Sequence, residues 1–355
     1  MNILIDGYYL DKKRGMGRYL QEVLYALNYQ INDSFNVSLI VPEKLDPIYE
    51  EKFNNINFIR ARKIPHPMWE QYTIPSFFKK GQYDLLHSPY NTTTLSINPE
   101  KVVVTIHDTM FLDKKHKNSG VYQWIGNKYR SFITKRISPK ATVITVSKES
   151  QISIKDKLNL NSKSYHTPVD FFYDSVSSNL SESSSAFIYH IGGLSSHKNT
   201  ERVINAFNDI KDIIKEDLII SGMPSGTALE KKYSNPRIKF TGWISEYEMG
   251  SLYNNAELIV FPSLYEGYGL PVIEAIRFGK PLITSDINPM KEISRGAAIL
   301  INPKSTEELK KSILKVLSND DVKDALVKKT REVREKVNSR EFGVELINMY
   351  RGQVK

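Results

Sequence analysis

The 355-residue chain contains no cysteine, and this absence excludes several kinds of chemistry. Disulfide bonds, cysteine-ligated zinc, iron–sulfur clusters and thiol catalysis all require that residue. No apolar run approaches the roughly 18 residues that a membrane-spanning helix needs. The first ten residues, MNILIDGYYL, lack the basic flank and long apolar run of a signal peptide. We therefore expect a cytoplasmic protein.

Several catalytic motifs are also missing. The sequence has no HExxH, no Asp-x-Asp, no pair of histidines at metal-ligand spacing and no P-loop lysine motif. It has no Gly-x-Ser-x-Gly nucleophile elbow either. We therefore expect no metal and no bound cofactor, and nucleoside triphosphate hydrolysis loses its support.

Positive charge is concentrated in the first half of the chain. The net charge is +9, and residues 1–170 hold 24 Lys and Arg against 16 Asp and Glu, whereas the remaining residues hold 25 against 24. Such an asymmetry favours a phosphate-bearing partner, which can be a nucleic acid, an anionic membrane or a phosphorylated substrate. No nucleic-acid-binding motif accompanies the charge. A solvated, lysine-rich surface explains it equally well.

Short apolar runs alternate with amphipathic helical stretches along the whole chain, which predicts an α/β protein with parallel sheets. The expected strands are 2–6, 37–41, 83–86, 102–106, 142–146, 186–191, 217–221, 238–243, 257–263, 280–285 and 297–302. Seven of the twelve residues from 174 to 185 are serine, which is typical of a linker. We therefore expect a first domain at 1–173, a linker at 174–185, a ligand-binding domain at 186–338, and a helix at 339–355 that crosses back to the first domain.

Two glycine turns in the second half carry the strongest local signals, because ligands bind at the carboxyl ends of parallel strands. In the first, Gly269 and Leu270 precede a proline and open a helix, between the carboxylates of Glu266 and Glu274. In the second, paired glycines lead to Lys198 and a helix start. Two helix starts that are ready for an anion suggest a diphosphate. Ordinary turns with a solvated lysine and a first-turn acid remain the alternative.

Two weaker signals lie in the first half. His107 and Asp108 follow an apolar strand, where catalytic groups of such folds are found, although a satisfied histidine beside a turn-capping aspartate explains them equally well. The loop GMGRY, residues 15–19, is too short for a dinucleotide fingerprint but suits a loop close to a ligand.

Six segments, in register along the chain, resemble the retaining enzymes of glycosyltransferase family 4, which have the GT-B fold. They are GMGRY at 15–19, VVVTIHD at 102–108, TVITVSKES at 142–150, YHIGGLSSHKN at 189–199, FTGW at 240–243 and EGYGLPVIEA at 266–275. The resemblance implies two Rossmann-like domains facing across a deep cleft. It also implies transfer of a hexose from a nucleoside diphosphate sugar, with GDP-mannose favoured and a UDP-sugar as the alternative.

The resemblance also implies roles for individual residues. His107, Lys198 and Glu266 would be catalytic: His107 would bind the donor sugar near O6, Lys198 would neutralise the diphosphate, and Glu266 would contact O3 and O4. The remaining donor-side positions would be Gly17, Gly193, His197, Tyr268, Gly269, Leu270 and Glu274, of which Glu274 would bind the ribose. Gly15 and Arg18, with Gly17, would line the acceptor side.

Two departures from the family pattern concern the phosphate site. His197 stands where the family usually has arginine, and Gly193 stands where many members have a second arginine. Front-face transfer with retention, in which the leaving phosphate accepts the acceptor's proton, is the mechanism that the resemblance implies.

We expect the acceptor to be a glycan or a lipid-linked glycan of bacterial surface polysaccharide, such as lipopolysaccharide. Basic segments at 60–63, 113–117 and 135–140 would bring the first domain to the anionic inner face of the membrane. Three alternatives stay open: a sugar-nucleotide epimerase of the same fold, a non-catalytic basic binding protein, and a degenerate transferase kept as a scaffold.

Overall fold

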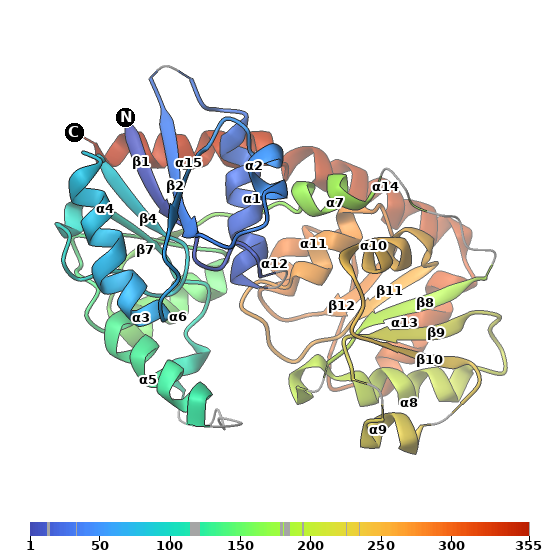
Figure 1. The fold of residues 1–355 in the computed structure, drawn as a ribbon. Helices are drawn as coiled ribbons and strands as arrows, with labels where there is room; N and C mark the ends of the chain where they lie inside the picture. The colour runs from blue at the N-terminus through green and yellow to red at the C-terminus, as the bar shows by residue number, and fades with distance from the viewer. Residues whose placement is uncertain are drawn as a thin grey trace. The chain divides into compact units, whose positions relative to one another are not determined.

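The computed structural model describes residues 1–354 except 13–14, 33, 114–120, 178–179, 181–184, 194, 225 and 234. Part of the expected loop at 11–19, most of the basic segment 113–117 and half of the serine-rich stretch therefore lie outside the described residues. The chain divides into two compact units (Figure 1). Unit 1 comprises Met1–Pro168 and Ser339–Lys355, and unit 2 comprises Val169–Asn338.

Unit 1 is built on a seven-stranded parallel sheet, the fold class that the sequence predicts. The strands are β1 (Asn2–Asp6), β2 (Asn36–Pro42), β3 (Asn57–Ala61), β4 (Leu85–Ser88), β5 (Val102–Thr105), β6 (Thr142–Thr145) and β7 (Ser162–Ser164). Their order is β3-β2-β1-β4-β5-β6-β7, so the winding direction reverses between β1 and β4. Such a reversal is where open α/β sheets bind ligands.

The central strands of this sheet are fully buried, which explains their nearly continuous apolar sequence. The helices of unit 1 are α1 (Met16–Asn28), α2 (Ile48–Lys52), α3 (His66–Met68), the π-helical turn η1 (Trp69–Thr73), α4 (Ile74–Lys80), α5 (Val121–Thr134), α6 (Lys148–Leu158) and α15 (Ser339–Gln353), with short 3₁₀ turns η2 (Pro99–Lys101) and η3 (Met110–Leu112). Leu4, Val104 and Trp69 belong to one hydrophobic core on the sheet.

The carboxyl-terminal helix α15 packs against α1 within unit 1 (Figure 1). A Cβ at Gly343 would lie 2.5 Å from the carbonyl oxygen of Ala26, so the absence of a side chain lets the two helices approach closely. The buried hydroxyl of Tyr350 lies 2.7 Å from Nδ1 of His87 in β4. The last helix of the chain therefore completes the core of unit 1.

Unit 2 repeats the design with a six-stranded parallel sheet of order β10-β9-β8-β11-β12-β13. Its strands are β8 (Phe187–Ile191), β9 (Asp217–Ser221), β10 (Ile238–Gly242), β11 (Leu258–Phe261), β12 (Leu282–Ser285) and β13 (Ile299–Ile301). Its helices are α7 (Asp170–Ser177), α8 (Thr200–Ile210), α9 (Ala228–Lys232), α10 (Glu246–Asn255), α11 (Leu270–Arg277), α12 (Met290–Ser294), α13 (Thr306–Leu317) and α14 (Asp320–Lys336), with the 3₁₀ turn η4 (Ser196–Lys198). The winding direction of this sheet reverses between β8 and β11.

The predicted boundary between the domains is wrong in one respect. The expected linker begins at residue 174, but residues 170–177 form helix α7, which belongs to unit 2. Asp170 Oδ1 lies 2.9 Å from Arg277 Nε, and the ring of Phe172 packs edge-on against Phe278. The chain therefore passes from unit 1 to unit 2 after Pro168. The ion pair of Asp170 and the ring contact of Phe172 hold α7 within unit 2.

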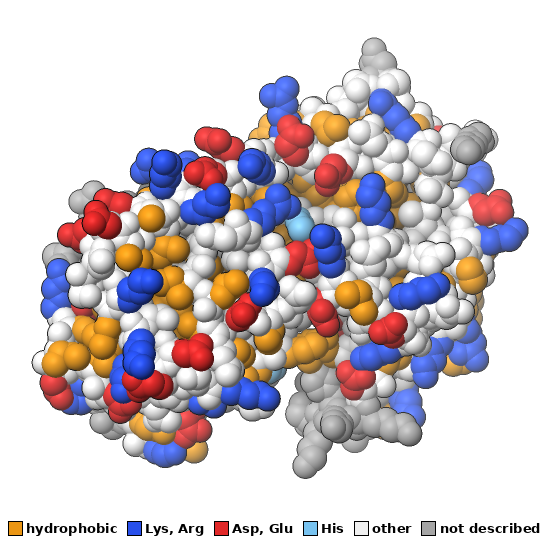
Figure 2. Space-filling view, turned by 180° about the vertical axis from the view of Figure 1, so that it is seen from behind, with side chains coloured by type: hydrophobic (Ala, Val, Ile, Leu, Met, Phe, Trp, Pro, Cys, Tyr) orange, Lys and Arg blue, Asp and Glu red, His pale blue; other side chains and the backbone are white. Residues whose placement is uncertain are grey.

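On the one face that Figure 2 shows, charges are mixed rather than gathered in one patch. Lysine and arginine side chains are interspersed there with acidic ones (Figure 2). Within the part of the chain that the structure describes, no helix is both long enough and apolar enough for a membrane span.

Candidate functional site

The two glycine turns that the sequence singles out follow neighbouring strands of unit 2. One follows β8 and leads through η4 into α8, and the other follows β11 and leads into α11. Because β8 and β11 lie side by side where the winding reverses, both helix starts meet at the same carboxyl edge. The sequence could not show this adjacency, since the two strands are separated by β9 and β10 along the chain.

Lys198 and Glu266 form an ion pair at this edge. Nζ of Lys198 lies 2.7 Å from Oε1 of Glu266, and the two side chains are 22% and 14% exposed. Ser263 lies beneath the pair, with its hydroxyl 2.8 Å from the same carboxylate oxygen. The structure therefore brings together two of the three predicted catalytic residues. A partly exposed pair of this kind can exchange its mutual contact for contacts to a ligand.

The backbone also ties the two turns to each other. The carbonyl oxygen of His197 accepts a bond from the N–H of Leu264 (2.7 Å), which fixes the turn after β8 against the loop after β11. Asn199 adopts a left-handed conformation with φ of 60°, and its side-chain amide donates to the carbonyl oxygens of Pro262 and Pro303. That side chain is used between loops and does not cap α8. The first N–H groups of α8 consequently lack a side-chain cap from Asn199.

Helix α11 begins in the same uncapped way. Gly269, the residue before α11, has a φ of 95°, a conformation that glycine adopts without a steric cost. No side chain at this position caps the helix. Tyr268 and Gly269 are buried, and Leu270 is partly exposed. Gly193 is partly exposed after β8, and a Cβ at this position would lie 3.4 Å from Lys198 Cγ.

Glu274 lies deeper than the other predicted residues. It is 2% exposed in α11, and its Oε2 accepts a hydrogen bond of 2.5 Å from the hydroxyl of Tyr253 in α10. The tyrosine orients the carboxylate from the neighbouring helix. Sequence reasoning did not single out Tyr253, because its position in α10 resembles that of any core aromatic residue.

His107 occupies the carboxyl edge of the sheet in unit 1, directly after β5. Its backbone N–H donates to Oδ1 of Asn91 (2.6 Å), and its ring Nε2 lies 2.8 Å from the carbonyl oxygen of Pro89. A carbonyl oxygen only accepts hydrogen bonds, so Nε2 carries the proton and Nδ1 is left as an acceptor. Burial lowers the pKa of His107, which keeps the ring neutral at pH 7. Asp108 instead accepts a bond from the N–H of Met110 and caps the turn.

The glycine-rich loop has a structural explanation of its own. Gly15 precedes α1 with a φ of 51° and is exposed. A Cβ at Gly17 would lie 1.9 Å from the carbonyl oxygen of Lys12, so glycine is required there by the chain's own backbone. Arg18 is 6% exposed in the first turn of α1. Roles of these three residues in binding stay predictions.

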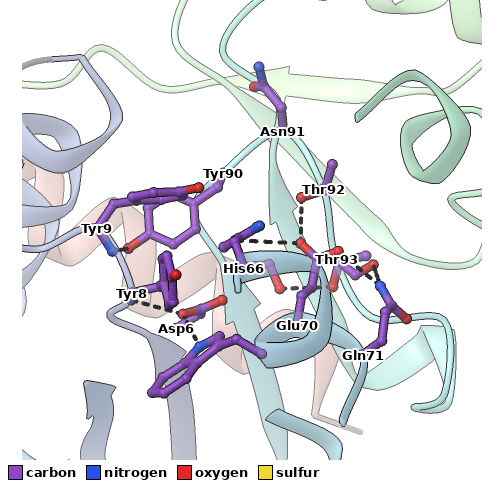
Figure 3. A network of polar contacts seen from close by, with 12 residues as sticks. Asp6, Tyr8, Tyr9, His66, Glu70, Gln71, Tyr90, Asn91, Thr92 and Thr93 are labelled. Atoms are coloured by element: carbon purple, nitrogen blue, oxygen red, sulfur yellow. Dashed lines mark hydrogen bonds and ion pairs between the residues drawn. The ribbon is translucent and has the colours of Figure 1, made fainter. Parts of the chain in front are cut away.

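A second constellation in unit 1 was not predicted from the sequence. Asp6, the last residue of β1, accepts bonds from Nε1 of Trp69 and from the N–H of Tyr8, both at 3.0 Å (Figure 3). Glu70, on the π-helical turn η1, accepts bonds from the hydroxyls of Tyr129 (2.6 Å) and Thr92. Both carboxyl groups are 1% exposed.

These two acids share an apolar setting. Burial raises the pKa of Asp6 to about 7, and burial with the nearby charge of Asp6 raises that of Glu70 to about 7. His66 lies 3.9 Å from Glu70 and stacks on the ring of Tyr9, and burial lowers its pKa to about 4. Asp6 ends an apolar strand, and His107 follows one. A polar residue at the end of an apolar strand is the one sequence signal that could have identified this cluster. Nothing in the sequence around Glu70 marks it.

The chain has two units, each with a parallel sheet whose winding reverses at an edge that carries polar groups. This is the architecture of the GT-B fold, and the class of protein is a glycosyltransferase. The family model described as "Glycosyltransferase Family 4" matches residues 14–170, and the one described as "Glycosyl transferases group 1" matches residues 174–333. The chain belongs to glycosyltransferase family 4.

Curated relatives include mannosyltransferases. The serotype-specific mannosyltransferase WbdA of Escherichia coli is 26% identical over 144 residues, which cover 38% of this chain and 18% of the relative. This chain thus matches less than a fifth of WbdA. The O-antigen chain mannosyltransferase RfbU of Salmonella typhimurium is 26% identical over 313 residues, with 81% of this chain and 83% of the relative covered.

Solved structures agree on the fold. Sucrose-phosphate synthase from Thermosynechococcus elongatus superposes with a TM-score of 0.70 and 18% identity, covering 99% of this chain and 98% of that one. At this identity the likeness establishes the GT-B fold.

Proposed function

We propose that this chain transfers a hexose, with mannose favoured, from a nucleoside diphosphate sugar to a glycan or lipid-linked glycan, with retention of configuration. The observation that carries the proposal is the Lys198–Glu266 pair between two uncapped helix starts on neighbouring strands of unit 2. A diphosphate needs positive potential and a hexose needs hydroxyl partners, and this edge offers both.

Leaving-group stabilisation is the main catalytic task of unit 2 in this proposal. Negative charge develops on the diphosphate as the sugar–oxygen bond breaks. The ammonium group of Lys198 and the backbone N–H groups at Tyr268, Gly269 and Leu270 neutralise that charge, so no metal is needed. Glu266 then accepts hydrogen bonds from sugar hydroxyls, and the buried Glu274 serves the ribose.

His107 contributes a neutral acceptor. With its Nε2 proton committed to Pro89, the free lone pair on Nδ1 accepts a hydrogen bond from a hydroxyl group, such as that at C6 of the donor hexose. A neutral lone pair does not attract phosphate, so the tautomer supports contact with the sugar rather than with the diphosphate.

The names of the relatives support GDP-mannose over a UDP-sugar as donor, because WbdA and RfbU are both named mannosyltransferases. They also support an acceptor in bacterial surface polysaccharide. Unit 1 is where we place that acceptor, since the sheet of unit 1 also reverses between β1 and β4.

Peripheral contact with an anionic membrane forms part of the proposal. Trp124, Ile125 and Phe132 of α5 are each about half exposed, and Lys128 lies over the Trp124 ring at 5.5 Å. Exposed aromatic and basic side chains on one helix are typical of interfacial helices. Binding to anionic vesicles that exceeds binding to neutral ones at low salt supports this contact, and equal binding refutes it.

The deciding experiment incubates the purified chain with GDP-mannose or UDP-sugars and candidate glycan acceptors, with and without a metal chelator. We expect release of the nucleoside diphosphate, a new glycosidic bond of retained anomeric configuration by NMR, and no loss on chelation. A rearranged sugar nucleotide without transfer establishes an epimerase instead. Salt-dependent binding to random DNA without affinity for any sugar nucleotide establishes a basic binding protein.

A further inference from the structure

Glu70 connects three elements of unit 1 at the reversal point of its sheet (Figure 3). It lies on η1, it accepts a bond from Tyr129 of α5, and it accepts a bond from Thr92 in the loop after β4. Asp6 holds η1 in place by accepting the indole N–H of Trp69. π-Helical turns are rare and recur at functional sites.

The loop at residues 89–94 is buried and strained. Tyr90 and the four residues after it are 2–3% exposed, and Asn91 has a φ of 34°, in the left-handed region that disfavours side chains. A strained loop persists where its surroundings hold it. Bonds from Thr92 to Glu70, from Gln71 to the carbonyl oxygen of Thr93 (3.3 Å), and from Thr134 to that of Asn91 (2.8 Å) supply the restraint.

The same loop fixes His107. Pro89 supplies the carbonyl that sets the tautomer, and the side chain of Asn91 binds the backbone N–H of His107 at 2.6 Å. The ring of Tyr19 packs edge-on against the imidazole, with the centroids 4.7 Å apart. The hydrogen bond to the ring and the side-chain bond to the backbone N–H of His107 therefore both come from a loop that Glu70 restrains.

We propose that Glu70, when ionised, is a positioning residue for His107: by holding the loop at 89–94 through both carboxylate oxygens it keeps the imidazole in the tautomer and orientation that present Nδ1 to a sugar hydroxyl. The effect of Glu70 on sugar transfer rests on the proposed function, whereas its effect on the orientation of the His107 imidazole does not.

Three variants test the proposal. Glu70→Gln keeps the shape but replaces one acceptor oxygen by an NH₂ group, and Thr92→Val removes the hydroxyl that reaches Glu70. Thr94→Val is the matched control, because Thr94 is equally buried in the same loop but accepts a bond from Ser96 instead. Thermal unfolding shows which variants are folded.

The first readout is the ¹⁵N spectrum of histidine-labelled full-length protein at pH 8.5, where Glu70 is ionised, with the His107 signals assigned from a His107→Gln variant. We expect a neutral, Nε2-protonated ring in the wild type and in Thr94→Val, and mixed tautomers in Glu70→Gln and Thr92→Val. A wild-type ring protonated on Nδ1 overturns the proposal without any variant. Unchanged His107 signals in whichever of the two test variants is folded also overturn it.

The second readout separates this proposal from the proposed function. We expect kcat for transfer to fall by roughly tenfold or more in the two test variants, because small displacements of a reacting group are costly, with the Kd for the nucleoside diphosphate unchanged. An altered His107 tautomer in a protein that transfers no sugar refutes the function and leaves the positioning role standing. A normal kcat despite mixed tautomers refutes the catalytic part of the positioning role.

Discussion

The two sheets reverse their winding at edges of opposite character. In unit 2, the edge between β8 and β11 carries an ion pair whose members are partly exposed, Lys198 and Glu266. In unit 1, the edge between β1 and β4 carries Asp6 and Glu70, which are fully buried under aromatic rings and have no cation bonded to them among the described residues. Sheets of similar topology therefore carry partly exposed charged side chains at one edge and buried carboxyl groups at the other.

This difference matches the ligands that we propose for the two edges. An anionic ligand is attracted by a permanent cation and by backbone N–H groups that no side chain has capped. A hydroxylated, uncharged ligand gains nothing from a net charge, and it needs neutral acceptors held in fixed orientation. In unit 1 the buried acids serve orientation, since their oxygens are bonded to Trp69, Tyr129 and Thr92.

The largest effect that we expect comes from removing the cation of unit 2. Lys198→Ala lowers kcat by about 10²–10³-fold, or about 2.7–4 kcal/mol, because one preorganised partner of the leaving group is lost. Steady-state release of the nucleoside diphosphate measures the change. The variant remains folded, because Lys198 lies at an edge that is open to solvent.

Lys232 offers a matched control for this prediction. Its Nζ lies 2.6 Å from Glu201 in an equally short ion pair, but the pair is exposed on α8 and α9. Lys232→Ala leaves kcat unchanged. Near-normal turnover of Lys198→Ala would falsify the assignment of the anion site.

A second prediction concerns the buried acids of unit 1. Glu70 keeps its proton to about pH 7 in the folded chain but loses it near its ordinary pKa of 4.5 when unfolded. The folded state therefore binds more protons between these values, and this group makes stability fall as the pH rises from about 4.5 to 7. The loss is at most about 3–4 kcal/mol, since the pKa values of the folded and unfolded states differ by about 2.5 units and one unit corresponds to about 1.4 kcal/mol.

Glu70→Gln has no carboxyl group to titrate at this position. We therefore expect the difference in unfolding midpoint, Glu70→Gln minus wild type, to increase from about pH 4.5 to pH 7. Thermal unfolding at a series of pH values measures it. Asp6, His66 and Tyr129 face the same carboxyl group. Because the charge of Asp6 is coupled to that of Glu70, the pH dependence of the difference reports the titration of this pair. A difference that is flat with pH means that Glu70 is ionised throughout.

How far the sequence predicts this molecule depends on burial. The six strands of unit 2 and the central strands of unit 1 were predicted, because strands covered on both faces are continuous apolar runs. Strands β3 and β7 were missed. They lie at the two edges of the sheet and include Asn57, Arg60 and Lys163, so no apolar run marks them.

The site divides in the same way. Residues that belong to local turns, such as Lys198, Glu266 and Gly269, are visible as short patterns. Tyr253 and Glu70 are not, because their partners Glu274 and Thr92 are more than twenty residues away, and only the folded chain brings them together. Gly17 shows a third case, since the nearby carbonyl oxygen of Lys12 is a structural reason for glycine there, and its role in binding stays a prediction.

A smaller effect is expected for the hydroxyl that orients Glu274. Tyr253→Phe removes a hydrogen bond to the buried Glu274 side chain, which lowers the free energy of unfolding by about 1.5 kcal/mol. If Glu274 serves the ribose, affinity for GDP falls as well, whereas His107 in unit 1 keeps its ¹⁵N signals. Calorimetric titration with GDP and with inorganic diphosphate separates the effects: weaker GDP binding with unchanged diphosphate binding supports the ribose role, and equal losses contradict it.

The smallest expected effect concerns His197 in unit 2. His197 sits in η4 beside Lys198, at a position where the family usually has arginine, so the edge carries fewer permanent charges than the family pattern provides. His197→Arg adds a cation that does not titrate and strengthens GDP binding by about 0.3–1 kcal/mol, a two- to fivefold gain that salt reduces. Calorimetric titration at two salt concentrations measures it, with guanosine as the ligand that shows no gain. Equal gains for guanosine and GDP would mean that the new side chain contacts the base, and the turn after β8 would then not face the phosphates.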